Sequence, residues 1–122
     1  MHFSSSSDRA MLRSLPPGQS RAAVEHAQGL QDAASLMLHR TASYGLAWQR
    51  YGALSNLVNA ARKVERLMGV WWDQNNGELP ELHKDALDDA VDAINYLQFF
   101  ITLAREGDIT GIRRELPVDE GN

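Results

Sequence analysis

Apolar residues recur along most of this chain at steps of three and four, the spacing that places them on one face of a helix. The first such run predicts a helix from Ser20, a suitable N-cap, to about Arg40. A longer run begins at Leu54 and predicts a second helix, whose apolar stripe we expect to face the core. That stripe consists of Leu54, Leu57, Val58, Ala61, Val64, Met68 and Trp72. The other side of this helix is polar and carries Asn56, Asn59, Arg62, Lys63 and Arg66.

A stretch rich in turn residues, DQNNGELP, separates the second helix from a third. Pro80 suits the first position of the new helix, and Gly107 supplies a left-handed stop after Glu106. One face of this helix combines Leu87, Ala90, Val91, Ile94, Leu97 and Ile101. The opposite face starts with Asp85, Asp88, Asp89 and Asp92 and continues with Asn95, Tyr96, Phe99, Phe100 and Leu103. A helix that becomes apolar all round is typical of one enclosed by other helices or by another subunit.

These patterns predict an all-α fold, a bundle of three to four helices in residues 20–107, and no β pattern of comparable strength competes with it. Residues 1–19 are rich in serine and contain Pro16 and Pro17, so we expect a mobile segment that stays outside the core. Residues 108–122 predict a short packed turn followed by a loose tail. A chain of 122 residues is long enough for one core without disulfides or metals.

Composition excludes several classes of function. The net charge of -4 gives no general attraction to nucleic-acid polymers or to anionic membranes. The absence of cysteine removes disulfides, thiolate nucleophiles and cysteine-based metal sites. The sequence shows neither a run of about 18 apolar residues nor the apolar segment of a signal peptide, so we expect a cytoplasmic protein.

The four aspartates of the third helix raise a question of charge. Like charges one helical turn apart repel by a few tenths of a kcal/mol, and the penalty grows as water is excluded. A divalent cation such as Mg²⁺ would compensate, because hard ions take oxygen ligands. The alternative is a solvated acidic face that interacts favourably with the helix dipole, an effect that suits Asp85 better than Asp92, about three turns into the helix.

Glu65 falls in the middle of the apolar stripe of the second helix. A carboxylate there is costly unless it is paired or binds a metal. Two long helices joined by a short loop usually lie antiparallel, so Glu65 and the aspartates could meet across one interface. The alternative is a buried pair with an arginine such as Arg40 or Arg50. Lys63 and Arg66 flank Glu65 and could neutralise phosphates, or could be ordinary solvated charges.

Two stretches of the chain resemble the MazG-like all-α nucleoside triphosphate pyrophosphohydrolases, particularly the compact phage-type members grouped as nucleotide-modification-associated domains. YGLAWQRYGALSNLVNAARKVERL is similar to the family's Tyr-Gly segment and the Arg-Lys-x-x-Arg-Leu helix that follows it. DALDDAVDAINYL is similar to the family's acidic helix, which ends in Asn-Tyr. The resemblance covers about Tyr44 to Gly107.

The resemblance implies Mg²⁺-dependent hydrolysis of a nucleoside or deoxynucleoside triphosphate to the monophosphate and pyrophosphate, with Mn²⁺ as a possible substitute. Asp89 and Asp92 correspond to the family's Glu-x-x-Asp motif. Of the second motif, Glu-x-x-Glu, only Glu65 matches, because Arg62 stands in the other position. The implied metal ligands are therefore Glu65, Asp89 and Asp92.

The remaining implied roles concern catalysis, the substrate and assembly. Glu65, Asp85 and Asp88 would serve as catalytic carboxylates, as further ligands or as the base that orients water. Lys63 and Arg66 would bind phosphates, and Asn95 and Tyr96 would border the sugar or base. The family implies a homodimer or homotetramer in the cytoplasm of a bacterial cell or a phage-infected host. The alternative function is a catalytically inactive helical module that binds a nucleotide or a protein.

Overall fold

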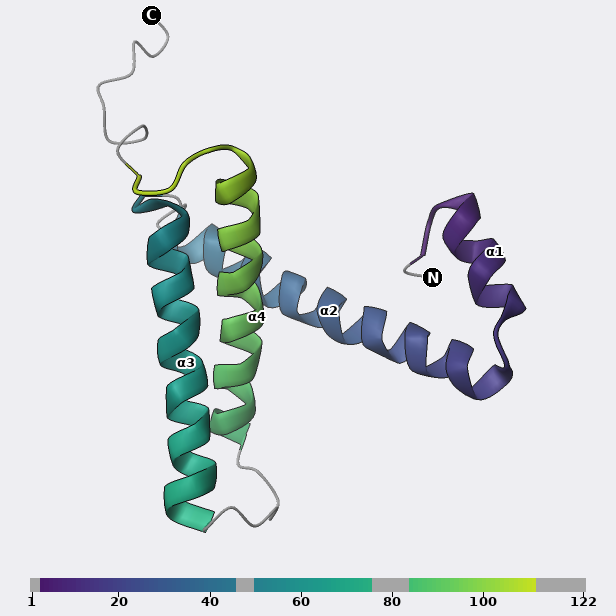
Figure 1. Ribbon diagram of the computed structural model, residues 1–122, viewed down its shortest axis with the longest axis horizontal. Helices are drawn as coiled ribbons and strands as arrows, with labels where there is room; N and C mark the ends of the chain where they lie inside the picture. The colour runs from purple at the N-terminus through teal and green to yellow at the C-terminus, as the bar shows by residue number, and fades with distance from the viewer. Residues whose placement is uncertain (1–2, 46–49, 76–83, 112–122) are drawn as a thin grey trace, which may run out of the picture. The chain divides into compact units, whose positions relative to one another are not determined.

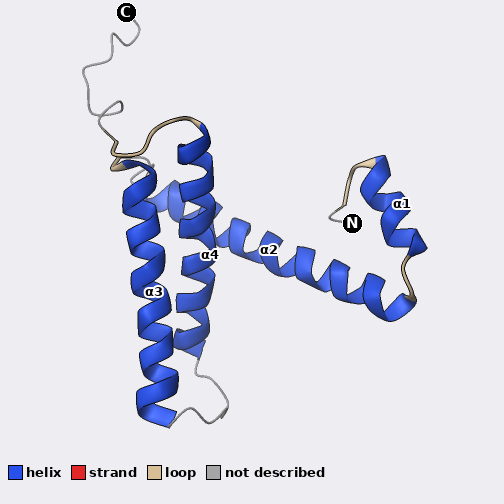
Figure 2. Ribbon diagram, viewed as in Figure 1, coloured by secondary structure: helices blue, strands red, loops and turns tan. Residues whose placement is uncertain are grey.

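The computed structural model describes residues 3–45, 50–75 and 84–111, and these residues form four helices and no strand (Figures 1 and 2). The predicted all-α class is therefore confirmed. Contacts between residues divide the chain into two compact units, Met1–Arg40 and Thr41–Asn122. Within the described ranges, no helix combines the length and the apolar character that crossing a bilayer requires.

Helix α1, Ser6–Ser14, lies in the segment that the sequence predicted to be mobile. The side chain of Ser5 caps it by accepting a hydrogen bond from the backbone nitrogen of Asp8 at 3.0 Å. Asp8 also places a negative charge in the first turn, where the helix dipole favours it. No residue of α1 is buried. That residues 1–19 stay outside the core is a prediction that this helix alone does not decide. Its mobility stays a prediction.

Helix α2, Pro17–Tyr44, begins earlier than the pattern predicted. The carbonyl of Pro16 accepts hydrogen bonds from the backbone nitrogens of Gln19 and Ser20, both at 3.0 Å. Ser20 is therefore inside the helix and is not its N-cap, and its hydroxyl donates to the carbonyl of Pro17 at 3.0 Å. Proline fits this first turn because its missing N–H would have no partner there.

The end of α2 also differs from the prediction. Gly45 has a φ of 70° and donates a hydrogen bond to the carbonyl of Thr41 at 2.8 Å. This left-handed residue stops the helix one turn beyond Arg40, where the apolar spacing had suggested an end.

Helices α3, Gly52–Asn75, and α4, Lys84–Arg105, lie side by side and run antiparallel, forming the α3–α4 hairpin (Figure 1). Pro80, the predicted start of the last helix, lies outside the described residues. At the other end Gly107 has a φ of 76°, and the backbone nitrogen of Asp108 donates to the carbonyl of Leu103 at 2.9 Å. This is the glycine stop that the sequence predicted.

Small side chains dominate the buried residues of the hairpin. Ala53, Asn56, Ala60, Ala86 and Ala93 are at most 6% exposed. Alanine lets two helix backbones approach closely, and antiparallel helices typically lie about 8 to 10 Å apart. The hairpin therefore closes on a narrow row of small residues.

The predicted core face of each helix was wrong. Six residues of the expected α3 stripe are between 39 and 68% exposed: Leu54, Leu57, Val58, Val64, Met68 and Trp72. Four residues of the expected α4 face are between 37 and 50% exposed: Leu87, Ile94, Leu97 and Ile101. Two helices can bury only the faces that meet. In this hairpin α3 and α4 meet through the faces that carry the small buried residues, and not through the faces predicted from their large apolar residues. We call these ten residues the apolar side of the hairpin.

The turn after α4 closes the hairpin onto the start of α3. The carbonyls of Asp108 and Ile109 accept hydrogen bonds from the backbone nitrogens of Ala53 and Leu54, both at 2.9 Å. The first N–H groups of a helix have no partner within it, so this turn satisfies two of them. The Asp108 carboxylate, in a residue only 3% exposed, accepts from the backbone nitrogen of Gly111 at 3.0 Å.

Two glycines make that closure possible. Gly52 and Gly111 have φ values of 78° and 81°. A Cβ at position 111 would overlap the backbone of Arg50 and Tyr51, and one at position 52 would lie 2.5 Å from the backbone nitrogen of Gly111. Close backbone approach and a left-handed conformation both require glycine here.

Candidate functional site

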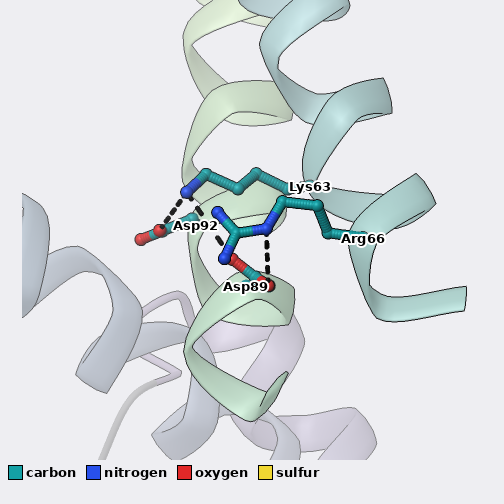
Figure 3. A network of polar contacts seen from close by, with 4 residues as sticks. All are labelled: Lys63, Arg66, Asp89 and Asp92. Atoms are coloured by element: carbon teal, nitrogen blue, oxygen red, sulfur yellow. Dashed lines mark ion pairs between the residues drawn. The ribbon is translucent and has the colours of Figure 1, made fainter. Parts of the chain in front are cut away.

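Lys63 of α3 bridges two aspartates of α4 (Figure 3). Its ammonium nitrogen lies 3.2 Å from a carboxylate oxygen of Asp92 and 3.5 Å from one of Asp89. The Nε of Arg66, one turn along α3, lies 3.6 Å from the other carboxylate oxygen of Asp89. We call these four residues the charged cluster.

Burial within the charged cluster is uneven. The side chains of Asp89 and Asp92 are only 9 and 11% exposed, that of Lys63 is 25% exposed and that of Arg66 is 68% exposed. Ion pairs shielded from water are stronger than solvated ones, so the contacts of Lys63 dominate the electrostatics. The positive charges of Lys63 and Arg66 offset the negative charges of Asp89 and Asp92, so the formal charge of the cluster is zero. This offset lowers the cost of burying the two carboxylates between the helices.

The position of Lys63 follows from the row of small residues on α3. Ala53, Asn56 and Ala60 are buried at steps of three and four, and the next step along the same row is Lys63. The sequence prediction placed Lys63 on the solvent side because it took the large apolar residues as the buried face. The row of small residues was the signal that could have identified Lys63 as the partner of the α4 aspartates.

Glu65 does not join the charged cluster. It is exposed, and two residues along a helix correspond to a rotation of about 200°, so it projects from α3 on a different face from Lys63. The structure thus brings Asp89 and Asp92 together with Lys63 and Arg66, and leaves Glu65 on the apolar side. The expected convergence of Glu65 with the aspartates is absent from this hairpin.

The other predicted site residues of α4 are spread along the helix. Asp88 forms an exposed pair with Lys84 at 3.1 Å. The side chain of Asp85 lies outside the described residues. Asn95 and Tyr96 are half-buried in the turn after Asp92, and the Tyr96 ring meets that of Phe99 edge-on, with centroids 6.3 Å apart.

The ligand preferences of Mg²⁺ show whether Glu65, Asp89 and Asp92, as they are arranged here, fit a metal site. In the part of the chain that the structure describes, no group of three or more acidic or histidine side chains could hold a metal ion. Mg²⁺ is nevertheless often bound by one or two carboxylates together with waters and substrate phosphates. Asp89 and Asp92, one turn apart, fit that limited role, whereas Glu65 does not. A metal at this pair must displace or share the ammonium of Lys63.

Comparison of the chain with family models, with curated proteins and with solved structures found no match. The likeness to MazG-like pyrophosphohydrolases therefore depends on the motifs of this sequence alone. Both of its motifs contribute to the charged cluster, Lys63 and Arg66 from the first and Asp89 and Asp92 from the second.

Proposed function

We propose that the charged cluster binds the phosphates and the Mg²⁺ ion of a nucleoside or deoxynucleoside triphosphate, and that the chain hydrolyses it to the monophosphate and pyrophosphate. The observation that carries this proposal is the meeting of two largely buried aspartates of α4 with the partly exposed Lys63 and the exposed Arg66 of α3. A homodimer or homotetramer is the assembly we propose for this enzyme.

The balance of charge supports binding of a metal-nucleotide complex. Without a ligand, Lys63 and Arg66 neutralise Asp89 and Asp92. A Mg²⁺-triphosphate carries both signs of charge, so it gives the carboxylates a cation and the two cations an anion. Lysine and arginine are the usual phosphate-binding side chains, and arginine can engage two oxygens at once. The exchange therefore leaves no charge of the cluster unpaired.

In the proposed reaction the residues of the cluster would have different roles. Asp89 and Asp92 would hold the metal, which supplies stabilisation of negative charge on the phosphates. Lys63 and Arg66 would orient the phosphate chain, and Asn95 and Tyr96 in the next turn would border the sugar or base. The base that orients water is proposed to be Asp85 or Asp88. The exposure of Glu65 gives it no role in this cluster.

Pyrophosphate release tests the proposal. Purified protein is incubated with a panel of nucleoside and deoxynucleoside triphosphates and Mg²⁺ or Mn²⁺. We expect release with at least one nucleotide, and its loss in Asp92→Asn and Lys63→Met. Asp32→Asn is the matched control, because Asp32 is an exposed residue of α2 whose carboxylate accepts from Gln28 at 2.8 Å. Release by the two cluster variants at the wild-type rate would show that the assignment is wrong.

A second candidate is a helical module that binds a nucleotide or a protein without turnover. Glu65 favours it, because the one acid that matches the family's Glu-x-x-Glu motif projects from a different face of α3 than Lys63, which contacts Asp89 and Asp92. Arg62, which stands in the other position of that motif, is also exposed. This candidate predicts a nucleotide-dependent rise in melting temperature with no pyrophosphate released from any nucleotide.

A further inference from the structure

The two aspartates of the charged cluster share one cation. Asp89 and Asp92 lie one helical turn apart on α4, and the ammonium of Lys63 reaches both carboxylates, at 3.5 and 3.2 Å (Figure 3). Both aspartate side chains are at most 11% exposed, and repulsion between like charges grows as water is excluded. In the chain without a ligand, Lys63 therefore does what a divalent cation would otherwise do, because it holds two like charges together.

Both cations of the cluster can turn toward water while the helices stay packed. The ammonium of Lys63 stands at the end of a flexible stem, and this side chain is 25% exposed. Arg66 is 68% exposed and lies 3.6 Å from Asp89. The helices themselves meet through the row of small residues that contains Ala60 and Ala93. The ion pairs between α3 and α4 can thus be exchanged for contacts with a ligand.

A ligand that carries a single sign of charge fits the cluster poorly. A metal ion alone would satisfy Asp89 and Asp92, but it would separate the partly buried ammonium of Lys63 from its carboxylates. A phosphate chain alone would attract Lys63 and Arg66, but it would draw them away from two largely buried acids that also repel it. Removing one partner of a shielded ion pair is costly, because the other charge keeps its desolvation penalty.

A ligand with both signs of charge avoids this cost. The metal replaces the ammonium at the carboxylates, and the phosphates receive the displaced ammonium. Because each event removes the cost of the other, metal and phosphate raise each other's affinity, and thermodynamic linkage makes that factor the same in both directions. The cluster therefore favours a complex of a metal with a polyphosphate over either component alone.

We propose that Lys63 is an internal counterion that couples metal binding to phosphate binding, so that the cluster takes a metal–polyphosphate complex in preference to a free divalent cation or a free nucleotide. The inference rests on the ligand class of the proposed function, and it holds whether or not the chain hydrolyses that ligand. It separates the role of Lys63 from that of Arg66, which contacts Asp89 from a largely exposed position. Selectivity for the metal complex then needs no contact with the base or sugar.

Two affinities of the full chain test the proposal. Electron paramagnetic resonance measures the binding of Mn²⁺ alone, because the signal of the free ion falls as it binds. Calorimetry measures the binding of α,β-methylene analogues of the deoxynucleoside triphosphates, which the proposed reaction cannot cleave, with and without saturating Mn²⁺.

Replacement of Lys63 should change both affinities. We expect Mn²⁺ alone to bind Lys63→Met about tenfold or more tightly than it binds wild type, because no ammonium competes for the carboxylates. The factor by which Mn²⁺ tightens the binding of the analogue should be about tenfold or more larger in wild type than in Lys63→Met. The metal–nucleotide complex that forms in solution is common to both proteins, so it cannot produce this difference.

Three further variants control the comparison. Lys63→Arg keeps a positive charge at this place and should bind Mn²⁺ alone within about threefold of wild type. Lys84→Met removes the same charge from an exposed pair with Asp88 and should also stay within about threefold. Lys63→Gln removes the charge but keeps a hydrogen-bond donor, and it replaces Lys63→Met if circular dichroism shows that the methionine variant is unfolded.

Either of two results would overturn the proposal. If Mn²⁺ alone binds wild type and Lys63→Met equally, or binds neither, the ammonium does not compete for the aspartates. If Mn²⁺ tightens the analogues by the same factor in both proteins, or the analogues bind neither, Lys63 does not couple the two ligands. Pyrophosphate release is scored separately. Release together with either result keeps the proposed hydrolysis and removes the role of Lys63, whereas coupling without release from any nucleotide does the reverse.

Discussion

Replacement of Lys63 by methionine is the sharpest test of how this hairpin tolerates its buried acids. Methionine keeps an unbranched apolar stem of similar length and removes only the ammonium. The change therefore deletes the contacts to Asp92 at 3.2 Å and to Asp89 at 3.5 Å while the packing of the stem is preserved. Arg66 still lies 3.6 Å from Asp89, so one cation of the charged cluster remains.

The expected loss follows from the burial of the three side chains. A contact between charged groups contributes about 1.5 to 3 kcal/mol, and removing one partner of a fully buried pair costs about 3 to 5 kcal/mol. The 25% exposure of Lys63 places it below that range. We therefore expect a loss of about 2 to 3 kcal/mol in the free energy of unfolding. For a unit the size of Thr41–Asn122, this corresponds to a fall of roughly 10 to 20 °C in melting temperature.

Thermal and urea unfolding, followed by circular dichroism, measure this loss. Lys84→Met is the matched control, because it removes the same charge from the same sort of contact, an exposed pair with Asp88 at 3.1 Å. Lys84 is 82% exposed, and such pairs one turn apart contribute only about 0.3 to 0.5 kcal/mol. If Lys63→Met costs no more than Lys84→Met, the charged cluster does not stabilise the hairpin and the reasoning is refuted.

The remaining predictions concern the metal, the closing turn and the core. Mg²⁺ should raise the melting temperature of Lys63→Met more than that of wild type, because the ammonium no longer competes for the aspartates; equal shifts would count against a metal at this pair. Gly111→Ala should cost more than about 3 kcal/mol in urea unfolding, whereas Gly45→Ala, with a φ of 70° and no atom within 4 Å of the added carbon, should cost about 1 kcal/mol. Leu103→Ala, at a residue with 0% exposure, should cost about 2 to 5 kcal/mol, and Leu38→Ala, at 64%, under about 1 kcal/mol.

Helix α3 shows most clearly what the amino-acid sequence could and could not predict. Helical periodicity correctly predicted a long helix through this region and another that stops just before Gly107. The choice of buried face failed, because the apolar arc of α3 is wider than one neighbouring helix can cover. The row of small residues that meets α4 is less apolar than the face left exposed, so hydrophobicity alone selected the wrong side.

The candidate site was only partly predictable, because it too depends on which face of α3 is buried. Clustered aspartates signalled a need for positive charge, and the resemblance to the MazG-like family singled out Asp89 and Asp92 among them. The sequence did not identify Lys63 as the residue of α3 that meets these aspartates. Lys63 and Glu65 are only two positions apart, and which of them faces α4 depends on the rotation of α3 about its axis.

The sequence by itself determined that this chain is helical, which segments contain its three long helices, though not the ends of α2, and that acids gather near the start of α4. These properties depend on local spacing and on single residues such as Gly107. Tertiary structure alone decided which face of each helix is buried, that Lys63 stands between two carboxylates, and that Glu65 remains outside. The physical reason is that a helix face is buried only where a neighbouring surface covers it. Close backbone approach through alanines fixes the rotation of α3 against α4, and that rotation determines which charged side chains come into contact.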